Sequence, residues 1–278
     1  MREKTRELLS EQADDRIVAA ASLFAQAWID GTTIDVFPND LAPRDLAEAS
    51  AMQDAMAAQI GEDIVGWKIA GKPGAPGGRI FASTSFGNGA TLPLPRYARN
   101  IIECEVGFKL RCDLPPREQP YEREEVAASA DLAINIELVG SRRTNAIERA
   151  AAALTAGKQF PDSDAEMFII IADNAGSLGL INGPVIEDWQ HRSLLDITVD
   201  LRIDGGESRP LLAKQNRTEP FDVLLWVAND LSERGIGLKA GHIITPGSVT
   251  VPLPLPEGST AVAVFEDLGQ VTVSLAVG

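Results

Sequence analysis

The sequence predicts an α+β fold, with a helical N-terminal region at residues 1–61 and a β-rich domain at residues 62–278. Two observations lead to this prediction. Before Gly61, apolar residues recur at the spacing of an amphipathic helix. After it, short apolar stretches alternate with polar residues and are separated by turns rich in glycine and proline. A chain of 278 residues can form one large domain with a small appendage, or two modest domains.

Two helices are expected in the N-terminal region. The first is rich in alanine and has apolar residues at helical spacing. The second covers about 43–60, because Met52, Met56 and Ile60 recur every four residues. Gly61 is a suitable end for this helix, since glycine tolerates the left-handed conformation that often terminates helices.

Residues 100–112 form the clearest predicted strand, because apolar and polar residues alternate along its whole length. Glu103 and Glu105 lie on its polar face. Helices are expected at 122–130 and 222–234, and residues 142–164 should be helical and then loop-like. The remaining strands are expected at 64–70, 132–139, 168–172, 178–181, 196–203, 208–212, 248–253, 260–265 and 270–276. Turns at 204–206 and 267–269 are predicted to close hairpins.

The charge of the chain excludes several classes of partner. A formal net charge of −15 disfavours nucleic acid and anionic membrane surfaces, both of which require clustered lysine and arginine. No apolar stretch approaches the 18 residues of a membrane-spanning helix, and the charged N-terminus has no signal-peptide core. We therefore expect a cytoplasmic protein that binds neither nucleic acid nor membranes.

Cysteine and histidine are scarce. Cys104 and Cys112 lie on the apolar face of one predicted strand, too far apart to form a disulfide, so both are expected to be buried free thiols. This is consistent with a reducing cytoplasm. His191 and His242 have neither zinc-ligand spacing nor a catalytic-triad context, and we expect both at the surface.

The pair Glu103 and Glu105 is the first candidate for chemistry. Residues two apart on a strand share a face, so both carboxylates can converge on one cation. A divalent ion would remove their mutual repulsion, and hard oxygen ligands favour Mg²⁺, Mn²⁺ or Ca²⁺. The alternative is that this pair belongs to the solvated face of a half-buried strand.

Two further charged residues lie in apolar strands. Glu137 stands inside an otherwise apolar stretch and needs a cationic partner, either a metal ion or an arginine such as Arg142 or Arg143. Lys68 lies in a short strand before a glycine-rich loop. It is either a solvated residue at a sheet edge or a buried functional amine.

Six segments in order resemble one family. The chain is similar to the 2-keto-4-pentenoate (2-hydroxypentadienoate) hydratases and the oxalocrotonate decarboxylases of the fumarylacetoacetate hydrolase superfamily. The similarity covers roughly residue 61 to the C-terminus. It is carried by the segments GWKIA at 66–70, IIECEVGF at 101–108, NIELVGSR at 135–142, IADNAG at 171–176, LLWVANDLSERG at 224–235 and LKAGHIITPGS at 238–248.

The resemblance implies a mixed β-roll body of the fumarylacetoacetate hydrolase type, which would make residues 62–278 the catalytic domain. It implies a divalent metal, Mg²⁺ or Mn²⁺, held by Glu103, Glu105 and Glu137, with Lys68 as the catalytic amine. The same resemblance suggests that the substrate is bound by three further residues, Phe81, Ser83 and Ser248. A homo-oligomer acting on a small 2-keto or enol acid is implied as well.

The resemblance also implies an activity and leaves alternatives open. The leading expectation is a hydratase that adds water to a 2-hydroxy-2,4-dienoate during breakdown of aromatic ring-cleavage products. The alternatives are decarboxylation of a 2-oxo-3-enedioate, hydrolysis of an acylpyruvate C–C bond, and a family member without catalytic activity. The chain departs from the family pattern at Ser83, Gly140, Pro246 and 218–220, positions that would surround the substrate.

Overall fold

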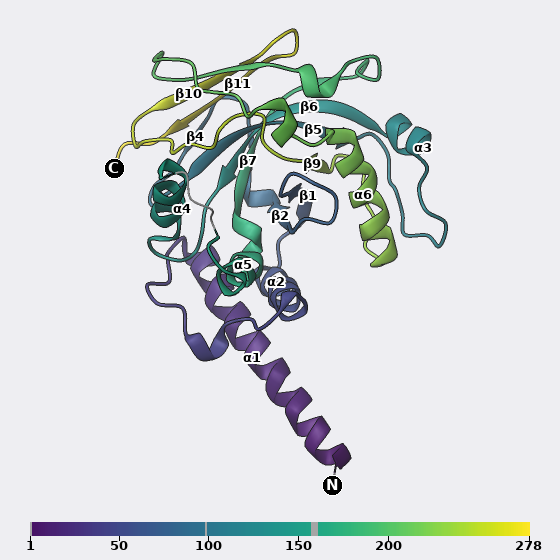
Figure 1. Cartoon of the computed structure of the whole chain (residues 1–278), viewed down its shortest axis with the longest axis vertical. Coiled ribbons are helices and arrows are strands. Elements are labelled where there is room, and N and C mark those ends of the chain that lie inside the picture. The colour runs from purple at the N-terminus through teal and green to yellow at the C-terminus, as the bar shows by residue number, and fades with distance from the viewer. Residues whose placement is uncertain (1, 98, 157–160) are drawn as a thin grey trace. The chain divides into compact units, whose positions relative to one another are not determined.

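The computed structural model describes residues 2–97, 99–156 and 161–278. The chain divides into two compact units, which are described separately. One comprises residues 1–62 and 140–176, and the other comprises residues 63–139 and 177–278. The expected α+β class, with helices at the N-terminus and a curved mixed sheet after them, is confirmed (Figure 1).

The first unit is helical. Helix α2 begins after Asp45, whose side chain accepts a hydrogen bond from the Glu48 amide, and ends at Gly61 in the left-handed conformation. The helix predicted at 43–60 is therefore confirmed, with its first turn at Leu46. The elements of this unit are α1 (Arg2–Asp30), η1 (Asn39–Leu41), α2 (Leu46–Ile60), α4 (Ala146–Thr155), α5 (Asp164–Ala172) and η3 (Asn174–Gly176).

The strand predicted at 168–172 is wrong, because these residues form the end of helix α5. A short apolar stretch fits a buried strand and a buried helix equally well. The deciding signal lies upstream, where the Ser163 side chain accepts a hydrogen bond from the Glu166 amide and caps the helix.

Residues 140–176 belong to the helical unit, whereas the sequence predicts them in the β-rich domain. Two buried ion pairs hold this segment. Arg142 pairs with Asp173, and Arg143 pairs with Glu166 at 2.6 Å. The division into independent domains at residues 61 and 62 stays a prediction.

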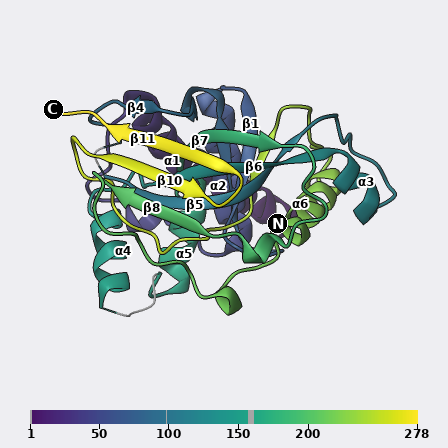
Figure 2. The ribbon, with the colours of Figure 1, turned by 90° about the horizontal axis from the view of Figure 1, so that it is seen from above.

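The second unit contains two sheets. The larger has the strand order β2-β1-β9-β5-β6-β7-β3. The smaller has the order β4-β11-β10-β8, and its strands are labelled in Figure 2. Strand β11 packs against β6 and β7, so the main core lies between the sheets. The elements are β1 (Ile64–Ile69), β2 (Gly77–Phe81), η2 (Ala82–Thr84), β3 (Ser85–Gly87), β4 (Ala90–Leu92), β5 (Ile101–Leu110), α3 (Arg123–Ala128), β6 (Ala130–Val139), β7 (Ser177–Ile186), η4 (Leu194–Asp196), β8 (Val199–Ile203), η5 (Lys214–Asn216), α6 (Pro220–Glu233), β9 (Ile243–Thr245), β10 (Thr260–Phe265) and β11 (Gly269–Leu275).

Strands β5 and β6 form the centre of the larger sheet. They pair antiparallel over ten residues, with Glu103 opposite Glu137 and Glu105 opposite Asn135. Residues directly opposite one another share a face, and successive residues alternate between faces. One face of this pair is therefore apolar and joins the core, while the other face collects the acidic residues.

Two predicted strands, 208–212 and 248–253, are absent from the described structure. Only isolated bridges form there, linking Leu211 to Thr250, Ile102 to Leu253 and Glu105 to Ser248. Prolines at alternate positions in 252–256 remove the amide donors that a ladder requires.

Two surface predictions are also corrected. Cys104 is buried as expected, but Cys112 is exposed, because β5 ends two residues earlier at Leu110. His191 is exposed as expected. His242 is buried and stacks edge-on against Trp67, with ring centroids 5.3 Å apart. No helix among the described residues is long and apolar enough to cross a membrane.

Candidate metal centre

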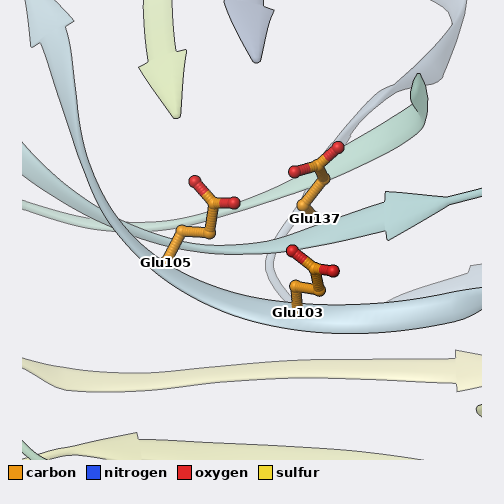
Figure 3. Close-up of side chains that lie close together, drawn as sticks. All are labelled: Glu103, Glu105 and Glu137. Atoms are coloured by element: carbon orange, nitrogen blue, oxygen red, sulfur yellow. The ribbon is translucent and has the colours of Figure 1, made fainter. Parts of the chain in front are cut away.

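Three carboxylates converge on the polar face of β5 and β6. One oxygen from each of Glu103, Glu105 and Glu137 lies within 4.8 Å of the others. Figure 3 shows the three side chains extending from neighbouring strands toward a common point. Glu105 is fully buried, Glu137 is 2% exposed, and Glu103 is half-buried at the edge of the cluster. Glu103 and Glu105 are therefore not part of a solvated strand face, which was the alternative interpretation of this pair.

Lys68 brings a positive charge to this cluster. Its Nζ lies 3.5 Å from Oε1 of Glu137, and the residue is 8% exposed. Lys68 reaches the cluster because β1 pairs with β9, which in turn pairs with β5. Strand β1 lies between β2 and β9, so Lys68 is not a solvated residue at the edge of the sheet.

No arginine in the described part of the chain forms an ion pair with Glu137. The two candidates, Arg142 and Arg143, pair instead with Asp173 and Glu166. The long contact with Lys68 leaves Oε1 of Glu137 without a hydrogen bond. The negative charge of Glu137 therefore adds to the negative charges of Glu103 and Glu105.

Several buried oxygens around the cluster have no hydrogen-bond partner among the residues that the structure describes. They are Oε1 of Glu105, Oε1 of Glu137, Oδ1 of Asn135 and Oγ1 of Thr245. Asn135 lies opposite Glu105, and Thr245 lies opposite Lys68, so all four belong to one face of the sheet. Buried polar atoms without a partner are rare in folded proteins and indicate a missing ligand, ion or water.

Sequence reasoning did not single out Asn135 and Thr245. Asn135 could have been found, because it precedes Glu137 by two residues on the same strand and therefore shares its face. Thr245 depends on the pairing of β1 with β9, whose residues lie more than 170 positions apart in sequence. No local pattern reveals that pairing.

The charged side chains of the cluster shift one another's pKa values. Burial and the charge of Glu137 raise the pKa of Glu103 to about 7, against the opposing effect of Lys68. Burial, together with Glu137 and Glu103, raises the pKa of Glu105 well above its ordinary value. Burial would lower the pKa of Lys68, but the three carboxylates outweigh it and raise that pKa. One ammonium thus faces three carboxylates, and the imbalance favours a bound cation.

The donor set fits a hard divalent cation. Mg²⁺ prefers oxygen ligands at about 2.1 Å, and adjacent ligands of such an octahedron are about 3.0 Å apart. The carboxylate oxygens, no more than 4.8 Å apart, can reach that spacing by small rotations of flexible glutamate side chains. Oε2 of Glu105 also accepts a hydrogen bond of 2.9 Å from the Gly247 amide, which fixes the orientation of this carboxylate.

The three predicted substrate-binding residues lie in different surroundings. Ser248 lies beside the cluster, since its backbone pairs with Glu105, and it lines a cavity of about 100 Å³. Phe81 ends β2 and is buried, while Ser83 lies in the exposed turn that follows. Roles for these residues in binding substrate stay predictions.

The sheet topology is that of the fold predicted from the sequence, a mixed β-roll body of the fumarylacetoacetate hydrolase type. The solved 4-oxalocrotonate decarboxylase from Pseudomonas putida G7, complexed with magnesium and adipate, has a similar fold. Its TM-score is 0.75 at 21% identity, covering 94% of this chain and 97% of that chain. The same enzyme complexed with calcium and acetate gives a TM-score of 0.74. No protein-family model matches the chain.

Sequence comparison shows that the chain is also similar to hydratases. The chain is 26% identical over 282 residues to the 2-keto-4-pentenoate hydratase of Paraburkholderia phymatum, covering 94% of this chain and 98% of that protein. It is 27% identical over 198 residues to the 2-oxo-hept-4-ene-1,7-dioate hydratase of Escherichia coli, covering 70% of this chain and 68% of that protein. The chain is thus similar in sequence to several 2-keto-4-pentenoate hydratases and similar in fold to a 4-oxalocrotonate decarboxylase.

Proposed function

We propose that the protein is a metal-dependent hydro-lyase that adds water to a 2-hydroxy-2,4-dienoate, a product of aromatic ring cleavage. The observation that carries this proposal is the convergence of Glu103, Glu105 and Glu137 beside the buried ammonium of Lys68. The relatives named as 2-keto-4-pentenoate hydratases support the same reaction.

The metal is proposed to be Mg²⁺ or Mn²⁺, held by the three glutamates. Bound there, the ion would stabilise negative charge on the C1 carboxylate and the C2 oxygen of the substrate. Oxygen ligands alone, with no histidine or cysteine in the described cluster, favour these ions over zinc.

The reaction moves protons within the substrate and adds one water. The dienol first becomes a 2-oxo-3-enoate when the proton of the C2 hydroxyl is lost and C5 is protonated. Water then adds its oxygen to C4 and a proton to C3, giving a 4-hydroxy-2-oxo acid. Both steps develop negative charge on the C2 oxygen, so one arrangement of charges stabilises both.

Lys68 is proposed to be the proton donor and electrostatic partner of this oxygen. Its raised pKa keeps the amine charged at neutral pH, so it is suited to donate a proton and unsuited to remove one. Oδ1 of Asn135 and Oγ1 of Thr245 are buried and have no hydrogen-bond partner among the described residues, so we assign them the role of orienting the attacking water.

The proposed activity is tested by turnover of a small substrate panel with Mg²⁺ and with Mn²⁺. We expect 2-hydroxypentadienoate to be hydrated. The panel also contains 2-oxohex-3-enedioate and acetylpyruvate, the substrates of the decarboxylase and hydrolase alternatives. Cleavage of acetylpyruvate while 2-hydroxypentadienoate stays unchanged would refute the hydratase. A protein inert toward all three with either ion would have lost catalysis.

We also propose that the protein acts in the cytoplasm as a homo-oligomer. The small acid substrate and the family resemblance support this. Light scattering during size-exclusion chromatography measures the oligomer directly, and a mass of 29.7 kDa, that of one chain, would contradict it.

A further inference from the structure

We propose that Asn135 and Asn182 together hold one water molecule through both of its hydrogens, in position to act as the nucleophile of the hydration. This inference rests on the proposed function for the reaction, whereas the water site itself can be tested without any turnover. Asn182 is not one of the metal-binding or catalytic residues expected from the sequence.

The two asparagines are neighbours on the face of the sheet that carries the carboxylates. Asn135 on β6 is opposite Glu105 on β5, and Asn182 on β7 is opposite Asn135. Residues directly opposite one another on antiparallel strands share a face, and their Cα atoms are about 4.5–5.5 Å apart. The three side chains therefore form one row across three strands.

The amide of Asn182 is held in one orientation. Its Nδ2 donates to Oγ of Ser85 at 2.8 Å and to the carbonyl oxygen of Phe86 at 2.9 Å. Both acceptors belong to β3, which lies on the side of β7 away from β6. A carbonyl oxygen accepts only from the nitrogen of the amide, so the amide cannot be turned over, and Oδ1 of Asn182 is directed away from β3.

Asn135 provides a second oxygen of the same kind. Its Nδ2 donates to the carbonyl oxygen of Ala133 at 3.3 Å, within its own strand. The Oδ1 atoms of Asn135 and Asn182 are both buried and have no hydrogen-bond partner in residues 2–97, 99–156 and 161–278. Two neighbouring buried acceptors require a donor between them, because a buried oxygen without one destabilises the fold.

Water is the donor that fits this pair. One water has two O–H groups, and hydrogen bonds of about 2.8 Å allow it to bridge oxygens up to roughly 5.5 Å apart. That span matches the spacing of side chains on directly opposite residues. A second cation is disfavoured, because Lys68 and one divalent ion already balance the three carboxylates of the cluster.

A water held in this way is prepared to act as a nucleophile. Both of its hydrogens are bound to neutral amides, which leaves a lone pair of its oxygen free to face the substrate. In the hydration step the water oxygen bonds to C4, and the π electrons of the C3–C4 bond move toward the C2 oxygen. The water keeps one hydrogen as the new hydroxyl group and loses the other, while one proton is added at C3, so the addition is balanced. The asparagines exchange no proton and act as positioning residues.

The test separates the two steps of the reaction. Tautomerisation of 2-hydroxypentadienoate to 2-oxo-3-pentenoate consumes no water, whereas hydration of 2-oxo-3-pentenoate does. Both rates are measured by proton NMR with Mg²⁺ in the intact protein, in Asn182→Ala and in Asn135→Ala, and the second variant remains informative if the first folds poorly. Asn88→Ala is the matched control, because Asn88 also forms two hydrogen bonds, with Gln270 and Thr272 of the smaller sheet.

We expect Asn182→Ala and Asn135→Ala to slow hydration at least about tenfold and tautomerisation less than about threefold, because the lost hydrogen bond is to the water alone. Asn88→Ala should leave the ratio of the two rates unchanged. A purely structural role for the asparagines would lower both rates together. That result, or an unchanged rate of hydration, would overturn the proposal.

A crystal structure of the protein with Mg²⁺ tests the water site without turnover. We expect one water within about 3.2 Å of Oδ1 of Asn135 and of Oδ1 of Asn182, and we expect its loss in Asn182→Ala. An ion at this place, or no density there, would overturn the proposal. If the water is present but the intact protein hydrates no substrate, the hydratase fails and the water site stands. If the intact protein is a hydratase and no water binds there, the hydratase stands and the water site fails.

Discussion

Substituting Glu103 with glutamine should stabilise the metal-free protein at alkaline pH. The carboxyl of Glu103 has a pKa of about 7 in the fold against 4.5 in an unfolded chain, chiefly because of burial and the charge of Glu137. The folded state therefore holds this proton more tightly than the unfolded state. The stabilising effect of the proton is complete below pH 4.5 and is lost as the pH rises through 7.

The magnitude follows from the shift. A difference of 2.5 pKa units corresponds to about 3 kcal/mol, at roughly 1.36 kcal/mol per unit. Glu103 is only half-buried, and solvent screening lowers this upper limit to about 1–2 kcal/mol. Glu103→Gln mimics the protonated side chain at every pH, so it should be more stable than the unsubstituted protein by this amount at pH 8 and nearly equal to it at pH 4.5.

The assay is urea denaturation in EDTA between pH 4.5 and 8. Glu124→Gln, on an exposed position of α3, is the matched control and should change stability by the same small amount throughout. With excess Mg²⁺ the unsubstituted protein should become more stable than Glu103→Gln, because the ion binds more tightly to the cluster that retains all three carboxylates. If Glu103→Gln is equally destabilising at pH 4.5 and pH 8 in EDTA, repulsion within the cluster is refuted.

Three further predictions follow from the same geometry. Glu105→Gln and Glu137→Gln should each weaken Mg²⁺ binding at least about tenfold, because each removes a charged ligand. Calorimetry at pH 8 measures the affinity, and circular dichroism checks that the variants are folded. Unchanged affinity in either variant would show that the substituted residue does not bind the metal. Lys68→Met should lower kcat on 2-hydroxypentadienoate by about a hundredfold or more while metal affinity is retained; equal kcat would make the amine structural. Gly247→Ala should cost about 1–3 kcal/mol in urea, from strain at a φ of +133° and contact with Gly71. Its control, Gly74→Ala, also has a positive φ but meets no neighbour within 4 Å, and equal losses would disprove the contact.

The central strand and its acids were predictable because their signal is local. Alternation along 101–110 fixes the face of Glu103 and Glu105 without any knowledge of the fold. The convergence of Glu137 and Lys68 was not predictable from spacing. It depends on the order β1-β9-β5-β6, which the family resemblance supplied and no local pattern contains.

The errors arose where long-range packing decides the outcome. The apolar residues of 168–172 fit a helix or a strand, and the cap at Ser163 decided between them. His242 is buried because its ring meets Trp67, a contact between distant segments.

The central claim is that Glu103, Glu105 and Glu137 hold one divalent cation. A crystal structure determined from protein soaked in Mn²⁺, with anomalous scattering from the ion, measures this directly. The account predicts one anomalous peak with an oxygen of each glutamate at roughly 2.2 Å and water completing the octahedron. A fully occupied Mn²⁺ at another position, or a cluster in which one of the three glutamates is turned away from the ion, would contradict it.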